Sequence, residues 1–71
     1  MTEYPYFIPV MFDAGLLKKI FNDKKFKTYT NCLDATVKYI EKNSRLKERQ
    51  ILILEYKEQY DAKIVNILNY D

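Results

Sequence analysis

The chain of 71 residues has no histidine, one cysteine, one glycine and a single serine, Ser44. Without histidine, neither a Ser–His nor a Cys–His nucleophilic site can be built. One thiol without an imidazole also leaves too few ligands for a zinc site, and Gly15 does not belong to a phosphate-binding loop. The sequence therefore predicts no enzyme activity, no metal site and no cofactor.

The single cysteine, Cys32, excludes a disulfide within the chain. We expect it to be a half-buried small apolar residue on the second helix; the alternative is a nucleophile near the helix N-terminus, where the helix dipole would lower the pKa of its thiol. The longest uninterrupted apolar run is only 51–54, and no basic segment precedes an apolar stretch at the N-terminus. These features predict a cytoplasmic protein without a membrane span or a secretory signal.

The length permits one small domain, whereas 48% apolar and 31% charged residues favour a folded chain over a disordered one. A core this small is marginal, so a partner surface is an expected source of further burial. Lys, Ile, Tyr and Asn, which AT-rich codons encode, are abundant. That usage is typical of small proteins of phages or mobile elements.

The first half of the chain predicts an arm followed by two helices. Residues 1–12 contain Pro5 and Pro9, which favour an extended arm. Asp13 is a good N-cap for a helix over 13–23. In residues 24–30, Phe26, Thr28 and Thr30 alternate with Lys25, Lys27 and Tyr29. This spacing of two predicts a short strand that forms a two-stranded ribbon with the arm. A second amphipathic helix is expected over 31–43.

The second half predicts one long helix over 45–69, because it lacks Gly and Pro and has apolar residues spaced seven apart. The alternative is a strand at 50–56, since four successive apolar residues, two of them β-branched, do not fit one helix face. The predicted fold class is mainly α, a three-helix domain with an extended N-terminal arm, with α+β as the alternative.

The tyrosine content is the most unusual feature, with seven in the chain. Tyrosine is enriched at protein interfaces because its ring buries area while its hydroxyl keeps a polar partner. We therefore predict a small regulatory or inhibitory module that docks on another protein. The residues predicted to contact that protein are Tyr4, Tyr6, Phe7, Tyr56 and Tyr70.

The alternative function is binding of RNA or single-stranded DNA through the basic and aromatic segment 18–29. Its candidate residues are Lys24, Lys25, Phe26, Lys27 and Tyr29, in which lysines would neutralise phosphates and rings would stack on bases. The net charge of only +2 argues against strong binding to duplex DNA.

A third hypothesis is a structural subunit of a homo-oligomer, a homodimer in the simplest case. The seven-residue spacing of the predicted long helix places Leu46, Ile53, Tyr60 and Ile67 along one seam. Packing of this seam on the chain's own first two helices is the simpler alternative.

Overall fold

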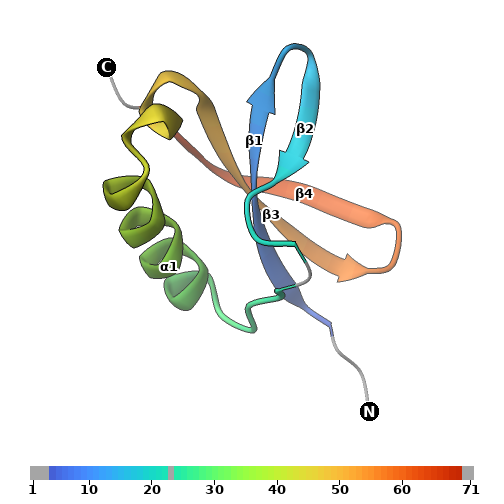
Figure 1. The fold of residues 1–71 in the computed structure, drawn as a ribbon. Helices are drawn as coiled ribbons and strands as arrows, with labels where there is room; N and C mark the ends of the chain where they lie inside the picture. The colour runs from blue at the N-terminus through green and yellow to red at the C-terminus, as the bar shows by residue number, and fades with distance from the viewer. Residues whose placement is uncertain (1–3, 23, 70–71) are drawn as a thin grey trace.

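The computed structural model describes residues 4–22 and 24–69. Its centre is a four-stranded antiparallel sheet with strand order β2-β1-β3-β4. The chain runs β1 (Tyr6–Asp13), β2 (Leu16–Lys19), α1 (Tyr29–Lys42), the 3₁₀ helix η1 (Ser44–Glu48), β3 (Gln50–Glu58) and β4 (Asp61–Leu68). Figure 1 shows α1 on one side of the sheet, with the β1–β2 and β3–β4 hairpins projecting away from it.

The predicted fold class was wrong: the protein is mostly antiparallel sheet with one α-helix, and not a mainly α three-helix domain. The arm over 1–12 contributes the central strand β1, paired on both sides. The predicted ribbon between the arm and 24–30 reduces to one bridge, in which the backbone N–H groups of Phe7 and Phe26 donate to each other's carbonyls at 2.7 and 3.0 Å.

The helix predicted over 13–23 is absent because Asp13 begins a turn there and caps no helix. Asp13 pairs with Leu16 across a two-residue connection, Ala14–Gly15, whose φ angles are 53° and 81°. Two successive positive φ angles define the type I′ turn that suits the twist of a β-hairpin, and glycine adopts that conformation without strain. The local turn chemistry therefore directs this segment into β2.

The helix predicted over 31–43 is present as α1, although it begins two residues earlier. The Thr28 hydroxyl is the N-cap and accepts a hydrogen bond from the Asn31 backbone N–H at 3.2 Å. Cys32, Thr36 and Ile40 are buried at intervals of four residues, so one face of the helix packs on the sheet. The Thr36 hydroxyl donates to the Cys32 carbonyl at 2.7 Å, which satisfies its buried polar group.

The long helix predicted over 45–69 is absent, and the strand alternative at 50–56 is confirmed by β3. The run Ile51–Leu54 is buried throughout because β3 is an inner strand, with α1 over one face and apolar side chains of the neighbouring strands beside it on the other. Alternate residues of a strand point to opposite faces, so Ile51 and Ile53 face α1 whereas Leu52 and Leu54 face away. Register shifts at Ile53/Leu54 and Tyr56/Glu58 bend the hairpin.

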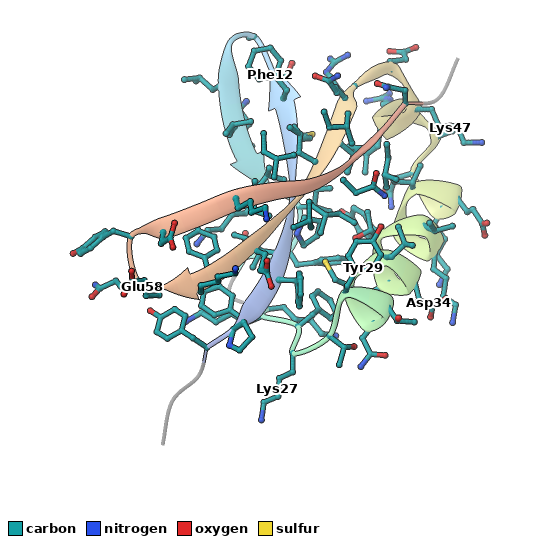
Figure 2. All side chains as sticks on the ribbon, turned by 180° about the vertical axis from the view of Figure 1, so that it is seen from behind. Phe12, Lys27, Tyr29, Asp34, Lys47 and Glu58 are labelled. Carbon is teal, nitrogen blue, oxygen red and sulfur yellow. The ribbon has the colours of Figure 1, made fainter. Side chains whose placement is uncertain are left out.

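On the side of the sheet that faces α1, the core contains Phe26, Cys32 and Ile53, with Phe7, Phe21 and Tyr29 among the residues packed around it. Asn66 of β4 joins the layers: its Nδ2 donates to the Tyr29 hydroxyl at 2.6 Å, and its Oδ1 accepts from the Ile67 backbone N–H at 2.8 Å. Figure 2 shows Tyr29 between helix and sheet.

The described helices include none with the length and apolarity that crossing a bilayer requires.

Candidate functional site

The sheet face opposite α1, here called the open face, carries a second apolar cluster. Strand register assigns its members, because residues directly opposite each other share a face. The cluster contains Tyr6, Ile8, Val10, Leu52 and Leu54, with Tyr4 and Tyr56 packed against it. Within 4–22 and 24–69, no residue of α1 or η1 belongs to this cluster, so no helix covers it.

Around this cluster lies an apolar rim, which we define as Phe12, Leu17, Ile64 and Ile67. Phe12 lies opposite Leu17, Leu54 opposite Ile64, and Leu52 opposite Ile67, so all four side chains extend the open face. Each is 44 to 56% exposed. Large exposed apolar side chains gathered on one face are typical of an interaction surface.

Stacked tyrosines form one end of the open face. The rings of Tyr6 and Tyr56, a cross-strand pair, lie 5.0 Å apart between centroids and only 12° from parallel. Tyr4 lies 5.2 Å from Tyr6 at a tilt of 30°. The Lys25 ammonium is 4.7 Å from the Tyr6 ring centroid, a cation–π contact. These contacts fix the rings in place.

A pocket of about 440 Å³, here called the basic pocket, opens beside these rings. Its wall includes Tyr6, Tyr56 and Ile8 from the open face, and Lys19, Lys24 and Lys25 from the end of β2 and the segment that follows. Lys19 lies directly opposite Val10 in the sheet, so it extends the open face at this end. None of the described residues that line the pocket is acidic.

The turn between β3 and β4 supplies the outer wall of the basic pocket through Gln59 and Tyr60. Tyr60 is 91% exposed, and its hydroxyl accepts a hydrogen bond from Gln59 Nε2 at 3.2 Å. Asn22 adds an amide on the other side. The pocket therefore combines ammonium, amide and phenol groups, most of them hydrogen-bond donors.

The residues predicted to form a protein interface divide between the two faces. Tyr4, Tyr6 and Tyr56 meet in the stacked tyrosines of the open face. Phe7 points to the other face, where its ring meets Tyr29 edge to face at 6.1 Å. Tyr70 lies outside the described residues. Three of the five candidates therefore come together. They do so although Tyr56 lies on a strand and not on the predicted helix.

The structure does not arrange the nucleic-acid candidates as one surface. Phe26 is buried and Tyr29 half-buried in the core that faces α1, so neither ring offers a free face to a base. Lys27 projects away from the body of the protein, as Figure 2 shows. Lys24 lies 5.3 Å from the Phe26 ring centroid and, with Lys25, lines the basic pocket.

The seam predicted for a homo-oligomer depended on a helix that is absent. Leu46 lies in η1, Ile53 is fully buried against α1, and Tyr60 lies in the β3–β4 turn. Only Ile67 reaches the open face. The four residues therefore share no common stripe.

Sequence reasoning missed Phe12, Leu17, Ile64 and Lys19 as surface residues of this face. A signal was present in the segment after Phe12, where Asp13, Ala14 and Gly15 separate two apolar stretches as a hairpin turn does. Interpreting that turn correctly would have placed Leu17 opposite Phe12. The register of β4 carries no comparable local signal.

Cys32 fits the apolar role that its sequence context predicted. It is fully buried, and burial raises the pKa of its thiol to about 11 despite the lowering effect of the Thr36 hydroxyl. A thiol with so high a pKa is protonated at neutral pH and reacts slowly as a nucleophile. In the described part of the chain, no three acidic or cysteine side chains converge as metal ligands do.

We expect Cys32 to resist a thiol reagent such as dithionitrobenzoate in the folded protein and to react promptly once denaturant unfolds it. Because the folded pKa is raised above the unfolded value, the contribution of this thiol to the free energy of unfolding should be constant below about pH 9 and should fall as the pH rises toward about 11. A Cys32→Ala variant in matched urea titrations isolates this contribution. Rapid labelling of the native protein would contradict the buried, protonated thiol.

No protein-family model, curated protein or solved structure shows significant similarity to this chain.

Proposed function

We propose that this protein is a small, non-catalytic binding module that docks on another protein through the open face of its sheet. The observation that carries the proposal is the apolar rim, whose large side chains stay about half exposed on a face without a covering helix. Burying the rim against a partner would remove this apolar surface from water, at about 25 cal/mol per Å².

The chemistry of the open face supports a protein partner. Aliphatic and aromatic side chains dominate it, and tyrosines border it, which is the composition of a protein interface core. The small core of the chain also gains from association, because a domain of this size buries a smaller share of its surface on folding than a larger domain does. A regulatory or inhibitory role, and a cytoplasmic location in which Cys32 remains reduced, are parts of the same proposal.

Two adjacent leucines of β2 provide a matched test. Leu17 belongs to the open face whereas Leu16, its neighbour along the strand, points to the opposite side; the two are 56% and 62% exposed. Leu17→Ser should weaken binding of the partner about tenfold or more, because burial of a leucine contributes about 1.5–3 kcal/mol. Leu16→Ser should leave binding unchanged.

The measurement begins with capture of a stoichiometric protein from a lysate of the native host, after nuclease treatment and at about 0.5 M salt, where exposed charge pairs are screened. Calorimetric titration of that protein with both serine variants then gives the affinities. Docking through the open face would be contradicted if Leu16→Ser and Leu17→Ser weakened binding equally, or if neither variant weakened it. Circular dichroism of both variants confirms that they remain folded.

Binding of single-stranded nucleic acid is the second candidate function, favoured by the lysines of the basic pocket beside exposed Tyr60. It predicts that nuclease abolishes capture and that affinity for an oligonucleotide falls log-linearly with salt. Loss of the captured material after nuclease would therefore replace the first proposal with this one.

A further inference from the structure

We infer that the basic pocket receives an acidic segment of the docked protein, whose carboxylates pair with Lys19 and Lys24 while its apolar residues extend onto the open face. This inference rests on the proposed function and specifies the chemistry of the partner. The pocket holds about 440 Å³, enough for two or three side chains and not for a folded element. Its occupant is therefore an extended stretch of chain or a loop.

Charge complementarity points to carboxylates. Three lysines line the pocket, and none of its described lining residues is acidic. In the described part of the chain, Lys19 and Lys24 belong to no ion pair, so their charges are not neutralised by a carboxylate there. A carboxylate beside them gains charge-assisted hydrogen bonds from the ammonium groups and from the amides of Asn22 and Gln59.

A second copy of this chain does not supply that chemistry through its own open face. The residues that strand register assigns to the open face between Tyr6 and Phe12, and opposite them on β2 and β3, are apolar or aromatic apart from Lys19 and Gln50. A symmetric dimer through this part of the open face brings the same surface from both subunits, so this part adds lysine and no carboxylate. We therefore assign the occupant to a different protein.

The surface beside the pocket favours an acidic protein segment over nucleic acid. A base needs an open ring face on which to stack. Tyr6 stacks with Tyr56, contacts Tyr4 and has Lys25 4.7 Å from its centroid, so its ring is already occupied, and the exposed ring that remains for a base is that of Tyr60 on the outer wall. Ile8 lines the pocket and also belongs to the apolar cluster, so a ligand that leaves the pocket on this side meets aliphatic surface. That surface suits apolar side chains and not phosphates.

Reversing the charge of two pocket lysines in the full-length protein tests the inference. Lys19→Glu combined with Lys24→Glu should weaken binding of the captured partner roughly tenfold or more at low salt and reduce the dependence of affinity on salt. The matched control is Lys42→Glu combined with Lys47→Glu, which changes the net charge equally on the exposed surface of α1 and η1. That control should bind as the natural sequence does.

A defined probe tests the pocket directly, without the natural partner. We would titrate the protein with a peptide of about ten residues in which glutamate alternates with leucine, a length that spans a typical strand. Heteronuclear NMR should show the largest shifts at Lys19, Lys24 and Tyr60. The same peptide with glutamine in place of glutamate should bind several times more weakly.

Each other outcome overturns the inference. Equal binding of the glutamate and glutamine peptides removes the role of carboxylates, and tighter binding of oligothymidylate than of the acidic peptide assigns the pocket to nucleic acid. If Leu17→Ser weakens the captured complex while the lysine reversal changes neither affinity nor salt dependence, only the pocket inference fails. If Leu17→Ser also has no effect, docking through the open face fails with it.

Discussion

Replacing Ile53 by alanine should lower the free energy of unfolding by about 2–5 kcal/mol, because it empties space in a core that cannot fully collapse. Ile53 has no exposed surface and lies on the central strand β3, in the cluster with Phe26 and Cys32 beneath α1. A domain of this length is stable by roughly 4–10 kcal/mol, so the loss is a large share of the total. Urea titration followed by circular dichroism measures it.

Ile64 provides the matched control for this variant. It is the same residue type in the neighbouring strand β4, but 52% of its surface is exposed. Ile64→Ala should change the free energy of unfolding by no more than about 0.5 kcal/mol. If the two variants lost equal stability, the assignment of Ile53 to the core and Ile64 to the rim would be wrong, and with it the register of β3 against β4.

Replacing Phe26 by alanine should lower the free energy of unfolding by about 3–5 kcal/mol, which is the second large effect that we expect. Phe26 is only 7% exposed and meets Phe21 edge to face at 5.9 Å. Its backbone is held by the reciprocal hydrogen bonds with Phe7. Truncation of the ring removes a core contact and loosens the link between the segment after β2 and strand β1. Thermal unfolding should show a markedly lower midpoint.

Phe12 is the control for this truncation, since it is 46% exposed at the end of β1. Phe12→Ala should leave the unfolding midpoint nearly unchanged and should weaken partner binding, because the ring belongs to the apolar rim. The pair also tests the hypothesis that Phe26 stacks on bases. A Phe26→Ala variant that kept full stability but lost affinity for an oligonucleotide would support that hypothesis and contradict the structure.

The sequence predicted α1 well because its signals are local. The amphipathic pattern of 31–43 identifies a helix without knowledge of the rest of the chain, although the cap is Thr28, before the predicted start. The two strands in place of the predicted helix over 45–69, β3 and β4, depend on non-local pairing. Ile51–Leu54 is apolar throughout because Ile53 packs under α1 whereas Leu52 and Leu54 join the cluster of the open face, and a seven-residue spacing in a bent hairpin has no structural meaning.

The candidate site was predictable in part for the same reason. Tyrosine content made Tyr4, Tyr6 and Tyr56 candidates for an interface, and the structure brings these three side chains together. The basic segment identified Lys24 and Lys25, which line the pocket beside them. Only strand order, however, reveals that the tyrosines and these lysines adjoin one another, because residues far apart in sequence meet there.

The Asn66 side chain has a consequence for how the protein behaves at high concentration. β4 is an outer strand, and an outer strand can recruit foreign strands through its unpaired backbone donors. Asn66 Oδ1 already accepts from the Ile67 N–H, at the point where the exposed isoleucines of β4 would otherwise attract a second chain. The same side chain ties this strand to Tyr29 of α1. We therefore expect Asn66→Ala to free this backbone donor and to lower the solubility of the protein.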